Sequence, residues 1–320
     1  MITAARLFFT LLAGVVLVIS SAAAQNFPSK PIRFVVSQTP GTPPDVLARI
    51  LVPEMSRFLG EAIIVENKPG AGGIIAFEYV AKQVPADGHT MVIVTVPGLA
   101  ILPLTVKNLR FDPLKDLPPF IGLGEGRYFF GTSSKYPWKT LAELVSHVRA
   151  NPGKLNYATT GANIHLISEA LVRDLGLNMT RIDYGNAGPY FQALASGEVQ
   201  LGVASGAFAV TLGEKFRLLV GTGDQRQAPY LDVPTFTELG LPKIPGVSYT
   251  LNVPVGIPKV ALDALYSAAS RTLQHSEVKA RFAKLHTEIA EQTPAAAASN
   301  LAEVAKFYAD MAKKIGLQPE

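Results

Sequence analysis

The residues best placed to bind a small charged molecule lie in the loop 37–45, directly after the first apolar segment of the mature chain. Segment 32–36 has the composition of a buried strand, and apolar residues recur over 46–59 at the spacing of one helix face. Thr42 and Asp45 form a T-x-x-D capping pattern with proline at the first helical position. Such a strand–turn–helix unit presents free backbone N–H groups and the positive end of a helix dipole. The loop therefore predicts either an anion site or a helix cap alone.

Strand and helix patterns alternate along the rest of the chain, which favours a mainly parallel sheet covered by helices on both faces. Further strands are expected at 62–65, 91–95, 155–158, 181–184, 199–204 and 216–220; apolar segments also occur at 120–123 and 128–131, and the chain is expected to return through 247–255. Further helices are expected at 75–84, 138–148 (capped by Thr140), 161–175, 189–194, 259–274 and 294–315. Pro53 is expected to kink or interrupt the first helix. The turn-rich link 111–116 leads into a crossover to a second domain, and helix 294–315 is expected to dock on the first domain.

The first 24 residues predict a secretory signal. Arg6 supplies a positive start, an apolar run follows, and three alanines at 22–24 form a small-residue cleavage site. The chain has no cysteine, so neither disulfides nor a lipid anchor on an N-terminal cysteine can form. At 320 residues the chain is long enough for roughly two domains and for a core that needs no disulfides. We therefore expect a soluble protein of the bacterial periplasm.

The charge pattern and the motifs of the chain argue against a nucleic-acid partner and against an enzyme. The sequence has 29 basic and 25 acidic residues; removal of Arg6 leaves 28 basic residues and a net charge of +3. The basic residues are scattered and form no stripe with aromatic residues. No metal-binding histidine spacing and no G-x-S-x-G motif occurs, and the glycine-rich turn 69–73 lacks a nucleotide-binding pattern. We expect no catalytic residues, no metal and no cofactor.

Two α/β lobes joined by two crossings would form a hinged clamp. Ligands of such sheets bind beyond the carboxyl ends of the strands. Five loops leave strands at that end, and we expect them to face a shared cleft: 38–45, 95–98, 159–163, 184–188 and 204–206.

Several segments together resemble the solute-binding proteins of the tripartite tricarboxylate transporters, the Bug (Bordetella uptake gene) receptors. The matching segments occur in family order over the mature chain: 27–33, 40–49, 65–73, 111–116, 152–158, 165–166, 232–235 and 256–258. The resemblance implies a two-lobed periplasmic binding protein fold, type II-like, with two hinge crossovers. Lobe 1 would comprise residues 25–122 and 247–320, and lobe 2 residues 123–246. It also implies delivery of a small organic carboxylate to a membrane permease, by a receptor that we expect to be monomeric.

The family's ligand is held by strand–helix loops, largely through main-chain N–H groups and hydroxyls. Carried over to this chain, the resemblance implicates Gln38, Gly41, Thr42, Asp45, Thr95, Thr159, Thr160, Gly161, Asn163, Tyr184, Ala204 and Ser205. His165, one turn into a helix beside the expected cleft, is a candidate ligand contact or a structural helix residue.

Three departures from the family pattern bear on the ligand. Thr42 replaces a glycine, Pro44 replaces a hydroxyl residue and lacks an N–H group, and Ala204 stands where aspartate is common. The loop 159–164 is also about two residues shorter. A missing carboxylate disfavours amino acids, because their ammonium group needs such a partner. We expect a monocarboxylate or a less polar organic acid. The alternatives are an altered ligand, lost affinity, a ligand-presenting partner of a sensor kinase, and a secreted enzyme on this scaffold.

Overall fold

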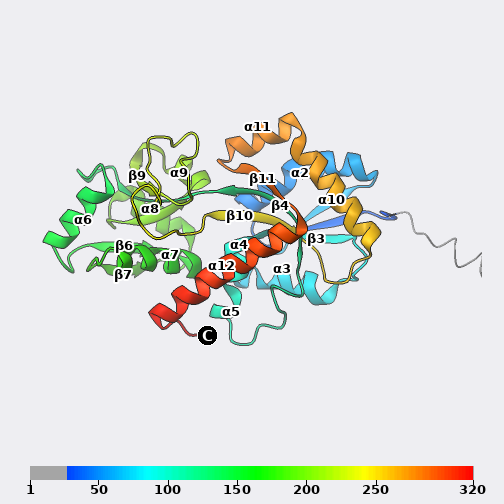
Figure 1. Ribbon diagram of the computed structural model, residues 1–320, viewed down its shortest axis with the longest axis horizontal. Coiled ribbons are helices and arrows are strands. Elements are labelled where there is room, and N and C mark those ends of the chain that lie inside the picture. Colours follow the sequence, from blue (N-terminus) through cyan, green and yellow to red (C-terminus); the bar gives the residue numbers. More distant parts are fainter. Residues whose placement is uncertain (1–26, 320) are drawn as a thin grey trace, which may run out of the picture.

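Two groups of strands, each covered by helices, lie side by side along the long axis of the molecule (Figure 1). The structure is a computed structural model that describes residues 27–319. The predicted signal segment 1–24 lies outside these residues.

The first group is a six-stranded sheet with the order β11-β4-β10-β3-β1-β2. Three parallel strands come from the start of the chain: β1 (Ile32–Val36), β2 (Ile63–Asn67) and β3 (Thr90–Thr95). The other three are antiparallel to their neighbours: β4 (Pro119–Gly126), β10 (Val247–Asn252) and β11 (Glu288–Gln292). Because β1, β2 and β3 run the same way, the residues that follow them meet at one edge of the sheet.

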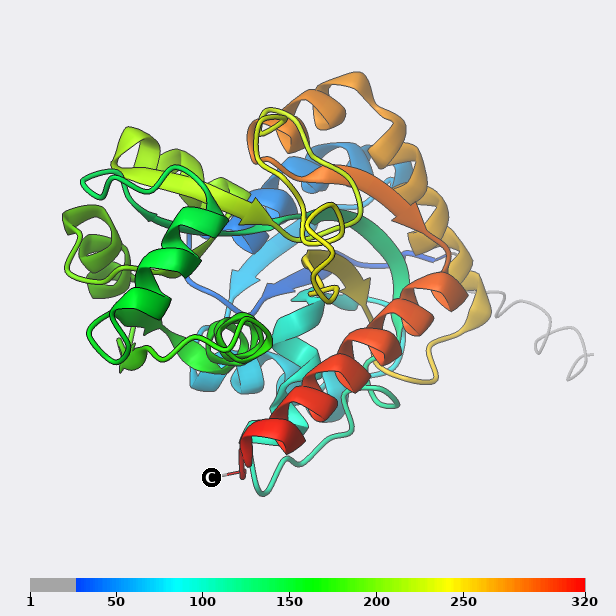
Figure 2. The same ribbon diagram turned by 60° about the vertical axis from the view of Figure 1, so that its left-hand side comes forward.

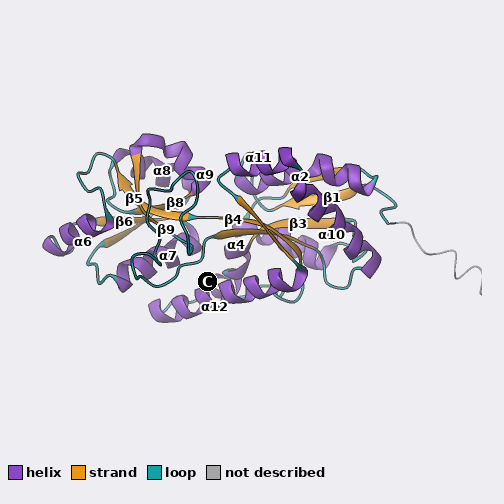
Figure 3. Cartoon of the chain, turned by 45° about the horizontal axis from the view of Figure 1, so that its top comes forward, coloured by secondary structure: helices purple, strands orange, loops and turns teal. Residues whose placement is uncertain are grey.

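Helices flank both faces of this sheet (Figure 3). In chain order they are α2 (Pro43–Leu59), α3 (Ile74–Glu78), α4 (Val96–Ala100), α5 (Leu102–Thr105), α10 (Lys259–Gln274), α11 (Ser276–Lys284) and α12 (Pro294–Ile315). A 3-10 turn at Ala71–Gly73 precedes α3, and a π-helical turn at Tyr79–Gln83 follows it. The four inner strands of the sheet are mostly buried, as expected for strands covered on both faces, whereas the edge strands β2 and β11 are only partly buried.

The second group joins a three-stranded sheet, β8-β5-β9, to the parallel pair β6-β7. Its strands are β5 (Tyr128–Ser133), β6 (Asn156–Thr159), β7 (Thr180–Asp183), β8 (Gly202–Ser205) and β9 (Phe216–Gly221). A single parallel bridge between Tyr157 and Leu201 connects the two sheets. The helices of this group are α6 (Leu141–Ala150), α7 (Gly161–Asp174), α8 (Ala187–Ser196) and α9 (Gly206–Leu212), with a 3-10 turn at Gly213–Lys215.

The chain passes between the groups twice. Arg127 alone separates β4 from β5, and the long segment 222–246 leads from β9 back to β10. The predicted lobe boundary at 122/123 falls inside β4, and that at 246/247 falls at the start of β10. The helix α12 packs on α4, α5, β4 and β11 and also touches α7 of the second group, so it spans both groups (Figure 2).

One local expectation needs correction. Pro53 does not interrupt the first helix: α2 continues through it to Leu59. Pro53 lies on an exposed part of the helix, so water can satisfy the carbonyl that its missing N–H leaves unpaired. Within residues 27–319, no helix is both long and apolar enough to cross a membrane.

Candidate functional site

Asp45 organises the loop between β1 and α2. Its side chain is buried, and its carboxylate accepts hydrogen bonds from the backbone N–H of Gly41 (2.9 Å), from Arg49 (3.0 Å) and from Asn67 Nδ2 (2.9 Å). The Asn67 amide also donates to the carbonyl of Gln38 (2.9 Å). Asn67 ends β2, so the loop after β1 is tied to the end of the neighbouring parallel strand.

Asp45 stays ionised because its partners outweigh its burial. Burial alone would raise the pKa of Asp45, but the hydrogen bonds from Arg49, Gly41 and Asn67 together bring it below its ordinary value. These bonds tie the loop to α2, through Arg49, and to the end of β2, through Asn67. Asp45 therefore positions Gly41 and Gln38 and offers no free carboxylate to a ligand.

Thr42 does not form the predicted side-chain cap. Its backbone is extended as in an N-cap, but its hydroxyl donates to the carbonyl of Thr39 (2.7 Å) and accepts no cap bond from α2. Pro43 and Pro44 occupy the first two helical positions and bring no N–H groups. The start of α2 is consequently poor in donors, which weakens the anion site predicted there.

The start of α7 is richer in donors. Its first residues, Gly161, Ala162 and Asn163, all carry N–H groups, and helices of this kind leave their first N–H groups without partners inside the helix. Thr160, at the N-cap, is extended and its side chain makes no cap bond. Gly161 has a φ of +63°, in the region that favours glycine, and is exposed. This terminus follows β6 directly, at the carboxyl end of the strand.

Tyr128 links α7 to another loop of the second group. Its hydroxyl accepts a hydrogen bond from Asn163 Nδ2 (3.2 Å), and its backbone lies opposite Ser205, the last residue of β8. Ser205 is half-buried and its side chain makes no cap bond with α9. Burial raises the pKa of Tyr128 to about 12, while the Asn163 bond acts against the shift, so the phenol stays neutral. Asn163 therefore lies beside a neutral hydroxyl, and Ser205 lies beside the backbone of the same tyrosine.

Thr95 reaches the same region from the first group. It ends β3 and lies opposite Tyr249 of β10. Burial raises the pKa of Tyr249, and Tyr128 adds to the rise. Gly98 in α4 makes room for the Thr95 side chain, because a Cβ atom there would lie 2.5 Å from Thr95 Oγ1. Thr95 thus lies beside Tyr249 of the first group, while Asn163 and Ser205 lie beside Tyr128 at the start of β5.

The other predicted side chains have different surroundings. Thr159 is buried and donates to Asp183 (2.7 Å), and the Tyr184 hydroxyl donates to Glu198 (2.8 Å). Ala204 is buried in the second core cluster. His165 contacts Arg181 and lines a separate cavity of about 470 Å³ with Tyr157 and the C-terminal residues 315–319. On a helix, His165 and Asn163 are two residues apart and face roughly opposite directions.

Asn67, Tyr128 and Tyr249 are the neighbours that the sequence did not single out. Asn67 could have been recognised from its position, because it ends a parallel strand, as Thr95 does, and because Gln38 closely follows another. Tyr128 and Tyr249 lie within apolar strand patterns, so nothing local distinguished them from core residues. Among residues 27–319, no three His, Asp or Glu side chains are grouped as metal ligands.

Two α/β groups joined by two crossings form an α/β periplasmic binding protein fold. The chain belongs to the tripartite tricarboxylate transporter family receptors, whose family model (TctC) matches residues 47–317. The fold, the family and its non-enzymatic receptor class are as the sequence predicts. Among curated relatives, the UPF0065 protein in the gbd 5' region of Cupriavidus necator is 32% identical over 301 residues, covering 93% of this chain and 91% of the relative.

Solved structures of similar proteins have the same fold as this chain. The periplasmic binding protein BugD superposes with a TM-score of 0.77 at 26% identity, covering 92% of this chain and 100% of that one. The R. palustris protein Rpa4515, solved with adipate, has a TM-score of 0.80 at 27% identity, with 92% and 100% covered. MatC from Rhodopseudomonas palustris, solved with malate, has a TM-score of 0.74 at 29% identity, with 89% and 99% covered.

Proposed function

We propose that this receptor captures a small organic carboxylate in the periplasm and delivers it to the membrane permease of a tripartite tricarboxylate transporter. The family supports the delivery step, and the acids in the structures of Rpa4515 and MatC support the ligand class. The predicted signal segment supports the location.

The observation that carries the proposal is the donor-rich start of α7. The N–H groups of Gly161 and Ala162, with the unused hydroxyl of Thr160, suit a carboxylate. Asn163 and Ser205 border this terminus through Tyr128, and Thr95 approaches from the other group. In this proposal Gln38 and Gly41 contact the ligand through a loop that Asp45 holds in shape.

We propose the lobe division 25–122 with 247–320 against 123–246, with hinge movement at the two crossings. Closure would remove the carboxylate from water, and oriented N–H and O–H groups of both lobes would compensate for the lost hydration.

The charges near this site favour an acid without an ammonium group. Asp45 is occupied by Arg49, Gly41 and Asn67, and Asp183 accepts from Thr159. Ala204 offers no carboxylate in the position where relatives often have aspartate. A monocarboxylate or a weakly polar organic acid therefore fits better than an amino acid.

A thermal-shift screen of carboxylic acids on the mature protein tests the proposal. A ligand that binds only the folded state raises the melting temperature, and the stabilisation grows with the logarithm of its concentration relative to Kd. We expect at least one carboxylic acid to raise it and the corresponding neutral amide to have no effect. Stabilisation by amides or sugars and by no acid would refute the ligand class.

A further inference from the structure

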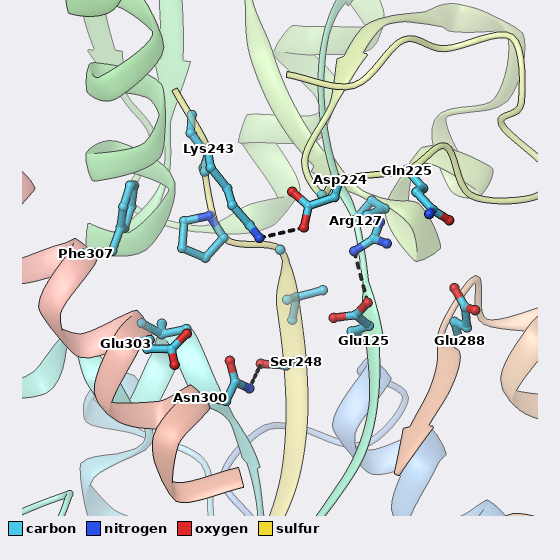
Figure 4. A pocket seen from close by; sticks show the side chains of 16 residues that line it. Glu125, Arg127, Asp224, Gln225, Lys243, Ser248, Glu288, Asn300, Glu303 and Phe307 are labelled. Atoms are coloured by element: carbon cyan, nitrogen blue, oxygen red, sulfur yellow. Dashed lines mark hydrogen bonds and ion pairs between the residues drawn. The ribbon is translucent and has the colours of Figure 1, made fainter. Parts of the chain in front are cut away.

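Two cavities of this chain differ in the side chains that line them. A cavity of about 600 Å³ at the two crossings contains the ion pairs Arg127–Glu125 (3.2 Å) and Lys243–Asp224 (2.7 Å) (Figure 4). A cavity of about 470 Å³ in the second group is lined mainly by apolar side chains. Figure 1 shows α6, which borders this second cavity, at the outer end of the second group. We call it the α6 cavity.

The α6 cavity is separate from the acid site proposed between the lobes. It contains no residue of the first group and none of the predicted ligand residues. Its volume is typical of small-molecule sites. Its walls come from α6 and the two residues before it, from Leu175 after α7, from β9, and from residues 232–241 of the segment that leads back to β10.

The α6 cavity combines a buried apolar wall with a charged mouth. Leu141, Val145 and Leu219 are buried, whereas Lys139 and Arg149 are exposed. A molecule that enters with an apolar part first would therefore keep a polar end near water and near these cations. Such a lining suits an amphipathic ligand with a negative end.

Four leucines of the α6 cavity leave apolar surface in contact with water. Leu239 is 44% exposed, and Leu175, Leu218 and Leu241 are only partly buried. Exposed apolar side chains that occur singly need no explanation, but these four line one concave space. Removal of their surface from water by a hydrocarbon chain is favourable. The leucines therefore specify the apolar part of the ligand.

Arg149 specifies the negative end. Its Nη2 donates to the carbonyl of Leu175 (3.0 Å), and both residues line the cavity. Among residues 27–319, no carboxylate lies at ion-pair distance from this guanidinium, which has further N–H donors to offer. With Lys139 the cavity has two cations against one carboxylate, that of Asp232. A guanidinium already held by one hydrogen bond can bind a carboxylate with little further loss of side-chain freedom.

We propose that the α6 cavity binds a medium-chain fatty acid. The carboxylate lies against Arg149, and the hydrocarbon chain lies against the leucines 175, 218, 239 and 241. Because the site belongs to the second group alone, it does not depend on the transport function proposed above.

Calorimetric titration of the mature protein with octanoate tests the site, with hexanoate, octan-1-ol and octylamine as matched compounds. We expect saturable binding of octanoate and about tenfold weaker binding of hexanoate, which lacks two methylene groups. Octan-1-ol and octylamine should also bind more weakly than octanoate, because neither carries the negative charge that Arg149 attracts.

Two exposed positions give variants that should fold. R149Q should weaken octanoate binding about threefold and leave octan-1-ol binding unchanged. L239S should weaken the binding of both compounds about threefold, since it removes apolar contact. K154Q is the control: it removes an exposed cation of the second group that lies outside the cavity, and it should change neither affinity.

No saturable binding of octanoate, or binding that neither R149Q nor L239S weakens, would overturn the site. Octylamine bound as tightly as octanoate would overturn the role of Arg149. Vesicles of phosphatidylglycerol should not compete with octanoate, and competition would overturn a free acid as the occupant.

The two acid sites can be tested separately. An acid found in the thermal-shift screen should bind R149Q as it binds the wild type, and at saturation it should not displace octanoate. Displacement would place octanoate between the lobes and overturn the α6 cavity as its site. A screen without any stabilising short acid would refute the transport ligand and leave the octanoate titration unaffected.

Discussion

Asp45 is the residue on which the shape of the first binding loop depends. It was predicted as a ligand contact, whereas its carboxylate bonds to its own loop and to Asn67, 22 positions away in the sequence. The local T-x-x-D pattern correctly marked the helix start. It could not reveal the Asn67 contact, because that contact depends on β1 and β2 pairing in parallel.

Replacement of Asp45 by asparagine should lower stability. The variant keeps a polar group of similar shape but loses the charged partner of Arg49, so we expect a loss of about 1–3 kcal/mol. Chemical denaturation at pH 7 measures it. D263N is the control: its exposed pair with Lys259 should be worth less than about 1 kcal/mol. Equal effects of the two variants would contradict the assigned role of Asp45.

The same carboxylate predicts a pH dependence. The folded-state pKa of Asp45 lies below its ordinary value, so its contribution is complete above the unfolded pKa, near 3.9, and is lost as the pH falls through the folded pKa. The stability difference between wild type and D45N should therefore be constant from neutral pH to about pH 5 and shrink below about pH 4. Denaturation midpoints measured over this range check it. A difference that grows on acidification would have the wrong sign.

Replacement of Tyr128 by phenylalanine should change ligand binding rather than folding. Y128F removes the hydroxyl that Asn163 contacts and leaves the aromatic ring, so we expect acid affinity to fall about threefold to tenfold. Titration with an acid found in the screen measures the change. Y266F, which alters a tyrosine of α10 in the first group, should bind the acid as the wild type does. If Y128F bound the acid as tightly as the wild type, Tyr128 would not belong to the ligand site.

At the scale of elements, long apolar patterns predicted the helices correctly, whereas short patterns left several elements unpredicted. Segment 294–315 was predicted with the bounds of α12, and 259–274 with those of α10. The missed elements were α4, α5, α9, α11 and β11. The residues of α4 include Pro97 and Gly98, which normally indicate a turn, and β11 is a polar edge strand with no alternating pattern. The secondary structure of such segments is decided by tertiary contacts, which the local sequence does not show.

The start of α7 gives a prediction of its own. Gly161 has φ +63°, and nothing but Asn163 Oδ1, at 3.9 Å, would approach an added Cβ atom. G161A should therefore destabilise the protein through backbone strain alone, by about 1–2 kcal/mol. Thermal or chemical unfolding measures this. G188A, in the first turn of α8 without a left-handed φ, should be neutral or slightly stabilising. A neutral G161A would mean that the α7 terminus adopts another conformation.

At the scale of the whole molecule, α12 adds a contact between the lobes that the sequence did not predict. It was expected to dock on the first domain, and it also touches α7 of the second group. The receptor fold itself was predictable, because several family segments occur in order along the chain. Only some of the expected loop residues have related surroundings: Asn163 and Ser205 lie beside Tyr128, whereas His165 and Tyr184 contact other partners.

A crystal structure with an acid that raises the melting temperature tests the central claim most directly. The account predicts the carboxylate between the lobes, with oxygen atoms within hydrogen-bond distance of the N–H groups at 161–162 and of groups on the first lobe. An acid bound away from the start of α7, or one that contacts a single lobe only, would contradict it.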